Sequence, residues 1–199
     1  PWARASAALA LARADRPEAW EALRQALGTD GPLGEIAAAA VLAHPPRDVT
    51  VLLGGRPIDS VRLVETLGAL GDQRAFLAVR AAITAGPAEL RARAAVVLTR
   101  LGTFETVPLA RHWRAAGAPG PFPLAAAEIL ALARASDAPA AIAALAETEA
   151  TRGAWLELVR ATPHRAAVPL LIRALATAGA PERSALCAAL GSAGGPDAS

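Results

Sequence analysis

The sequence feature that most constrains the fold is a Leu followed by a small residue, which recurs along the chain at an almost constant spacing. Clear copies of this pair begin at residues 11, 42, 70, 101 and 132, so successive copies are 31, 28, 31 and 31 residues apart. A fixed period of this size is typical of solenoids, in which stacked helix pairs bury their apolar faces against neighbouring repeats. The apolar residues are mostly Ala and Leu, which favour helix over strand. We therefore expect an all-α protein.

The segment 91–117 shows what one repeat contains. Its first helix carries Leu98 and Leu101 at helical spacing. Gly102 is suited to end that helix, because Gly adopts the left-handed conformation without steric cost. A second helix follows, with Pro108 in its first turn, where a missing N–H costs least. The segment thus reads as helix, tight turn, helix.

The same pattern predicts helices along the whole chain. Helices that end at or near a Leu-small pair are expected over 3–12, 34–43, 58–70, 87–101, 123–134, 152–159 and 181–190. Helices that follow a pair are expected over 17–27, 48–53, 74–85, 105–115, 138–148 and 166–178. The helix over 48–53 is the weakest, because Gly54, Gly55 and Pro57 interrupt it, so we expect an irregular repeat there.

Two strings resemble a known repeat family. RAAVVLTRLG, residues 93–102, and AVPLLIRAL, residues 167–175, resemble HEAT repeats, and are most similar to the short bacterial type found in phycobilin lyases. The resemblance implies a right-handed α-α superhelix of about six helix pairs. We expect these pairs to form a single domain over residues 1–199, which is either a whole protein or a fragment of a longer one. It also implies that the helices ending at the Leu-small pairs line the concave face. It is specific for fold and unspecific for function, since such repeats serve mostly as protein-binding scaffolds and occasionally as enzymes.

Charge and composition restrict the partners. All 20 basic residues are Arg, which we interpret as the codon bias of a GC-rich bacterial genome, and the net charge is only +2. Residues 57–116 hold eight Arg against five acids, an excess of three that is small for binding phosphates. No apolar run approaches the ~20 residues of a membrane span. We therefore expect a cytoplasmic protein with no membrane contact and no nucleic-acid partner.

One Arg recurs at a fixed place before the Leu-small pairs. Arg62 and Arg93 each lie eight residues before their pair, Arg4 and Arg183 lie seven before theirs, and Arg152 fits the same pattern. The favoured interpretation is structural, because the resemblance implies that such an Arg bonds turn acids or carbonyls of the neighbouring repeat. The alternative is an anion-facing stripe. We take Arg62, Arg93 and Arg100, on the central helices of the expected concave face, as candidate binding residues.

The tetrapeptide RHWR at residues 111–114 is the most distinctive local motif. A Trp between two Arg could stack on a base or anchor an interface. On a helix, however, Leu109 and Trp113 lie four residues apart on one face, which favours a core position for Trp113 with Arg111 and Arg114 in water beside it. We include Arg111, Trp113 and Arg114 among the candidate binding residues.

The sequence contains no motif typical of a catalytic or metal site. The three histidines, His44, His112 and His164, form no His-x-x-x-His or His-Glu pair, which argues against a metal centre. Cys187 lies among Ala and Leu and is expected to be an inert core residue. We therefore expect no catalytic residue, no metal and no cofactor.

These observations favour a non-catalytic protein-protein interaction scaffold that uses the concave face of the solenoid. The partner would be a protein whose identity the sequence does not reveal. Leu186, Cys187 and Leu190 could also face a neighbouring domain at the C-terminal end. Two alternatives remain: a lyase or chaperone-like enzyme with similar repeats, and, less favoured, nucleic-acid binding through the basic middle repeats.

Overall fold

A computed structural model describes residues 2–147, 149–161 and 165–194. These residues form twelve α-helices and three short 3₁₀ helices, with no strand among them. The prediction of an all-α protein is confirmed. The helices fall into two compact units, Pro1–Phe104 and Glu105–Ser199. The prediction of a single domain over residues 1–199 stays a prediction.

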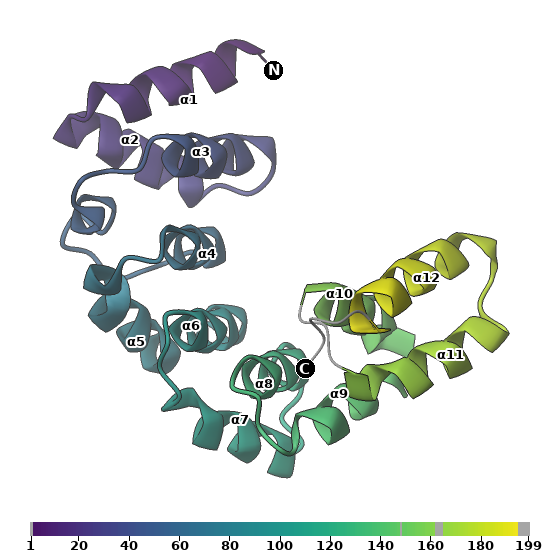
Figure 1. The fold of residues 1–199 in the computed structure, drawn as a ribbon. Coiled ribbons are helices and arrows are strands. Elements are labelled where there is room, and N and C mark those ends of the chain that lie inside the picture. Colours follow the sequence, from purple (N-terminus) through teal and green to yellow (C-terminus); the bar gives the residue numbers. More distant parts are fainter. Residues whose placement is uncertain (1, 148, 162–164, 195–199) are drawn as a thin grey trace. The chain divides into compact units, whose positions relative to one another are not determined.

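The first unit contains six α-helices and two 3₁₀ helices (Figure 1). They are α1 (Trp2–Ala14), α2 (Pro17–Leu27), α3 (Pro32–Ala43), η1 (Val49–Leu52), α4 (Val61–Leu70), η2 (Gln73–Ala75), α5 (Phe76–Ala85) and α6 (Ala88–Arg100). The α-helices that end at Leu-small pairs contact one another in the order α1, α3, α4, α6. Each of the other two, α2 and α5, packs against the helix that follows it.

The described part of the second unit also consists of helices. They are α7 (Thr106–Ala115), α8 (Phe122–Leu132), α9 (Ala138–Ala146), α10 (Glu149–Ala161), η3 (Arg165–Ala167), α11 (Val168–Thr177) and α12 (Ala180–Gly194). Here too the helices that end at or near Leu-small pairs contact one another, α8 with α10 and α10 with α12, while α7 and α9 both pack against α8. The two units therefore share one pattern of helix contacts.

The helix boundaries follow the punctuation of the sequence. Ser60 precedes α4 and accepts a 3.1 Å hydrogen bond from the backbone N–H of Leu63, which satisfies one of the free donors at that helix start. Gly102 follows α6 with a φ of 92°, the left-handed conformation expected of it. The predicted helix over 48–53 is a single 3₁₀ segment, Val49–Leu52, so the irregular repeat expected there is present.

The core of the first unit is made of Leu, Val and Ala. Leu63, Val64 and Leu67 of α4 are buried, as are Val97 and Leu98 of α6. Gly68 lets these two helices approach closely, because a Cβ added at Gly68 would lie 2.8 Å from a methyl group of Val97. Close packing of small residues therefore fills the space between α4 and α6.

Candidate functional site

Helix α7 positions the RHWR motif so that its side chains separate into two faces. Trp113 is only 5% exposed and packs against Phe122 of α8, with ring centroids 4.7 Å apart. The core position predicted for Trp113 is confirmed. Arg111 and Arg114, three residues apart, lie together on the other side of α7. Their side chains are 52% and 30% exposed.

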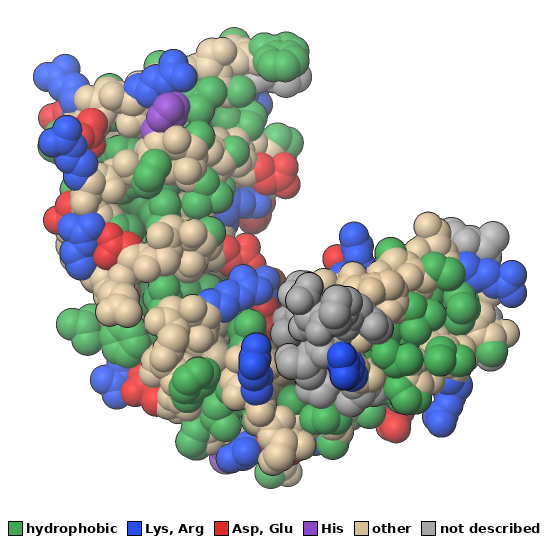
Figure 2. All heavy atoms as spheres, in the orientation of Figure 1, with side chains coloured by type: hydrophobic (Ala, Val, Ile, Leu, Met, Phe, Trp, Pro, Cys, Tyr) green, Lys and Arg blue, Asp and Glu red, His purple; other side chains and the backbone are tan. Residues whose placement is uncertain are grey.

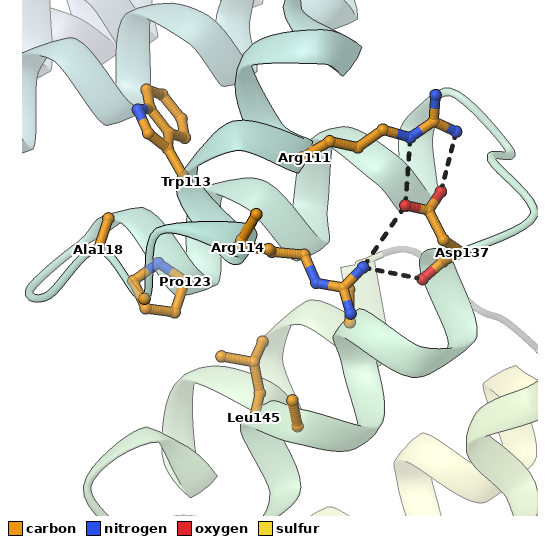
Figure 3. A pocket seen from close by; sticks show the side chains of 11 residues that line it. Arg111, Trp113, Arg114, Ala118, Pro123, Asp137 and Leu145 are labelled. Atoms are coloured by element: carbon orange, nitrogen blue, oxygen red, sulfur yellow. Dashed lines mark hydrogen bonds and ion pairs between the residues drawn. The ribbon is translucent and has the colours of Figure 1, made fainter.

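Both guanidinium groups converge on one carboxylate, that of Asp137. Arg111 donates from Nε to Oδ2 at 3.2 Å and from Nη2 to Oδ1 at 3.1 Å, a two-point contact. Arg114 reaches Asp137 only at 3.5 Å, from Nη1 to Oδ2 and to the backbone carbonyl (Figure 3). Among the described residues Arg114 has no other acceptor. The two arginines are therefore not simply solvated, as the sequence suggested, but are fixed by an acid that precedes α9.

Asp137 is committed to this contact as an ionised group. It occupies the N-cap position of α9, yet its side chain makes no capping bond. The hydrogen bond from Arg111 lowers the pKa of Asp137, and the positive charges of Arg111 and Arg114 act in the same direction. The bond to Asp137 likewise raises the pKa of Arg111. The group of three is thus charged at neutral pH, with two cations to one anion.

A cavity of about 560 Å³ lies beside this group, between α7, the start of α8 and α9. We call it the α7–α9 cavity. Arg111, Arg114 and Asp137 form its charged rim, and Trp113 contributes to its wall. The remaining wall is apolar and consists mostly of small residues, among them Ala118, Pro123, Ala141, Ala144 and Leu145. A volume of this size is within the range of ligand-binding pockets.

The rim and the apolar wall lie toward different ends of the α7–α9 cavity. Figure 3 shows Arg111 and Arg114 reaching toward Asp137, whereas Ala118 and Pro123 lie on the side away from that acid. Gly117, with a φ of 59°, turns the chain at the end of α7, so that the segment leading to Pro123 closes this apolar end. An occupant of the cavity would meet a cationic end and an apolar end.

The candidate residues of the first unit are used differently. Arg62 donates from Nη1 to the backbone carbonyl of Thr29 at 2.5 Å, and Arg93 donates to Oε1 of Glu65 at 2.9 and 2.6 Å. Arg100 is the last residue of α6 and is exposed. The structure thus brings Arg111, Trp113 and Arg114 together at one cavity. Arg62 and Glu65 line a separate, polar cavity of about 390 Å³ in the first unit.

The structural interpretation of the recurring Arg is confirmed at Arg62, which bonds the Thr29 carbonyl in the turn between α2 and α3. Arg93 and Arg152 also bond neighbouring elements, but their partners are helix acids rather than turn acids: Glu65 of α4 and, in a 2.8 Å ion pair, Glu182 of α12. Arg4 and Arg183, in contrast, form no side-chain bond to the described residues. Figure 2 shows this pairing of charge on the surface, with blue and red side chains next to one another at several places over the first unit.

The other three tryptophans differ in burial. Trp20 and Trp155 are buried, whereas Trp2 is 86% exposed. The prediction that Cys187 is a core residue is wrong, because its side chain is exposed and the apolar face of α12 is formed by Leu186, Ala189 and Ala193 instead. His164 lies outside the described residues.

Among the residues described, no group of three or more His, Cys, Asp or Glu side chains is placed to hold a metal ion. In the same part of the chain, no helix has the length and apolarity that crossing a bilayer requires.

Sequence reasoning missed the acid and most of the apolar wall of the α7–α9 cavity. Asp137 directly precedes a predicted helix, where an Asp is expected as an N-cap, so nothing in the local sequence indicated a partner 26 residues earlier in the chain. Leu145 and Ala141 have the spacing of ordinary core residues. Only the packing of both α7 and α9 against α8, which brings them to the same cavity, distinguishes them.

Comparison with known proteins adds no relative. No family model matches the chain, and no curated protein or solved structure is similar enough to count as a match.

Proposed function

We propose that this chain is a non-catalytic protein-binding module in the bacterial cytoplasm, built as a right-handed α-α superhelix of HEAT-like helix pairs. The contact pattern supports this architecture. In each unit the helices that end at Leu-small pairs contact the next helix of the same kind, as stacked repeats do. The partner is a protein that contributes a segment to the second unit.

The α7–α9 cavity is the observation that carries this proposal. Binding sites for protein anchors combine an apolar, desolvated pocket with a few fixed polar groups, and Arg and Trp are frequent in them. The cavity has this composition, with Leu145, Ala141 and Pro123 in its wall and Arg111 and Arg114 at its rim. We place binding here rather than at Arg62 and Arg93, because those two side chains hold neighbouring segments of the first unit together.

An enzymatic function is less compatible with this geometry. Asp137 is the one carboxylate among the described residues that line the cavity, and the bonds from Arg111 lower its pKa. A general base works best with a pKa near the operating pH, so an acid shifted downward is poorly suited to accept a proton. The rim is therefore better suited to bind a charged group than to transfer a proton.

Nucleic-acid binding is also less compatible. Base stacking requires an exposed aromatic face, but the ring of Trp113 is covered and packs against Phe122. Several arginines of the basic middle segment are paired with acids, Arg74 with Asp72 and Arg93 with Glu65. Such pairing reduces the charge available to phosphates.

A selection with and without the cavity tests the proposal. The intact chain would be used to select peptides from a random library displayed on phage. Ala144→Trp places a large ring in the cavity at an exposed position of α9, and it should abolish enrichment of the peptides selected by the wild type. Ala140→Trp is the matched control, since Ala140 is an exposed residue of the same helix that does not line the cavity. Both variants should unfold at the same urea concentration as the wild type.

Together, the two variants show whether peptide binding depends on the α7–α9 cavity. Loss of enrichment in Ala144→Trp alone supports a protein-binding function at the α7–α9 cavity. Equal enrichment by both variants places binding elsewhere and overturns the proposal for this site.

A further inference from the structure

The charge balance at the rim of the α7–α9 cavity indicates what an occupant must supply. Two guanidinium groups share the single carboxylate of Asp137, which leaves one positive charge uncompensated. Arg111 uses both carboxylate oxygens at 3.1 and 3.2 Å, whereas Arg114 has only contacts of 3.5 Å. A guanidinium carries five N–H donors, so most of the donor capacity of Arg114 has no acceptor among the described residues.

The apolar wall of the cavity selects for a different group. Ala118, Pro123 and Ala144 offer no hydrogen-bond donor or acceptor from their side chains, and each keeps apolar surface that an occupant can cover. A polar group placed against them would lose its hydrogen bonds to water without compensation. An aliphatic side chain placed there would instead gain the free energy of burying apolar surface.

We propose that the occupant of the α7–α9 cavity is an acidic peptide segment that places a carboxylate on Arg114 and a nearby aliphatic side chain against Pro123 and Ala144. This inference rests on the proposed protein-binding function and names the chemistry of the partner. The carboxylate compensates the excess positive charge of the rim, and the aliphatic group fills the apolar end. A phosphodiester chain would satisfy Arg114 but would leave the apolar wall uncovered.

The selection described above also provides the test. Peptides enriched by the wild type and lost in Ala144→Trp should share an Asp or Glu close to Leu, Ile or Val. The consensus peptide would then be synthesised with a fluorescent label, together with a version in which its acid is replaced by the amide. Fluorescence anisotropy would give both affinities for the wild type, for Arg114→Gln and for Arg165→Gln.

The expected result is a coupling between one arginine and one acid. Loss of the peptide carboxylate should weaken binding to the wild type roughly fivefold or more, as expected for a partly exposed charged hydrogen bond. Arg114→Gln should bind the acid and the amide peptides about equally. Arg165→Gln is the matched control, because Arg165 is an exposed arginine of the same unit that does not line the cavity, and it should behave as the wild type.

Different failures have different meanings. A cavity-dependent consensus without an acid, or with a basic residue in its place, overturns the acidic segment and leaves the proposed function standing. The absence of any cavity-dependent peptide overturns both. Tighter binding of a labelled oligothymidylate than of any peptide, if it is lost in Arg114→Gln, overturns the acidic segment in favour of nucleic acid.

Discussion

The α4–α6 contact of the first unit and the α7–α9 cavity of the second are built from similar residues but differ in packing. In the first, Gly68 brings two helix backbones so close that Val97 occupies all the space a Cβ would need. In the second, Ala141, Ala144 and Pro123 are also small, yet about 560 Å³ beside them is left open. Small side chains therefore fill space only where the backbones also approach, and between α7 and α9 they do not.

Arginine pairing also differs between these two regions. Near the α4–α6 contact, Arg93 donates to Glu65, which joins α6 to α4. In the second unit, Arg111 and Arg114 share Asp137, so the charges do not balance. A guanidinium that donates to an acid of the adjacent helix holds the two helices together. Two guanidinium groups that share one carboxylate beside a cavity keep N–H donors that a ligand can accept hydrogen bonds from. Three measurements test whether the two regions differ in packing and in charge pairing.

The largest effect is expected from truncating a leucine in each region. Leu67→Ala, at a fully buried position of α4, should lower the free energy of unfolding by about 2–5 kcal/mol. Leu145→Ala should cost somewhat less, by about 1 kcal/mol, because Leu145, although only 3% exposed, lines the cavity and so has packed neighbours on fewer sides than Leu67. Urea unfolding followed by circular dichroism measures both.

Leu77→Ala is the control for this comparison, since Leu77 is 73% exposed and its truncation should change stability by no more than about 0.5 kcal/mol. Equal losses at Leu67 and Leu145 would mean that the cavity is as well packed as the first core. The contrast between the regions would then not hold.

A smaller effect is expected from adding a methyl group at Gly68. Gly68→Ala adds a methyl group 2.8 Å from a Val97 methyl group and should cost about 1–3 kcal/mol by overpacking, despite the better helix propensity of Ala. Val97→Ala in the same chain makes room and should recover part of that loss. Thermal unfolding of the two single variants and the double variant gives the coupling. Strictly additive effects would contradict the close approach of α4 and α6.

The smallest effect concerns the acids. The pKa of Asp137 is lowered, so this group contributes stability that is present above its unfolded pKa of about 3.9 and is lost as the pH falls through its lower folded pKa. Arg111→Gln removes the main cause and should raise the pKa of Asp137 toward its ordinary value. A carboxyl NMR titration measures this directly.

Asp72 of the first unit provides the matched comparison. Hydrogen bonding by Arg74, two residues away, lowers the pKa of Asp72. Arg74→Gln should therefore raise the pKa of Asp72 and leave Asp137 unchanged. An Asp137 pKa that does not respond to Arg111→Gln would show that the long-range pair at the rim is not formed in solution.

The sequence predicts the helices well and the site only in part. The expected range 17–27 coincides with α2, and the expected 138–148 begins at the same residue as α9, because Pro, Asp and Gly mark those ends by local chemistry. The RHWR motif also predicted binding residues on α7, the helix that contributes Arg111 and Arg114 to the cavity. Asp137 could not be paired with Arg111 in advance, since that contact depends on how α9 lies beside α7. Cys187 was misplaced for a similar reason, because Ala and Leu surround it on both faces of α12 and periodicity could not decide between them.

The Ala, Gly and Pro residues in the wall of the α7–α9 cavity have a consequence for selectivity. Ala118, Ala141, Ala144 and Gly117 have no side-chain rotamers, and the ring of Pro123 is fixed, so ordering these residues costs almost no side-chain entropy. The same residues cannot adjust their shape to a poorly fitting occupant. The backbone therefore fixes the shape of this part of the wall. The wall should accept occupants that fit this shape and exclude those that do not.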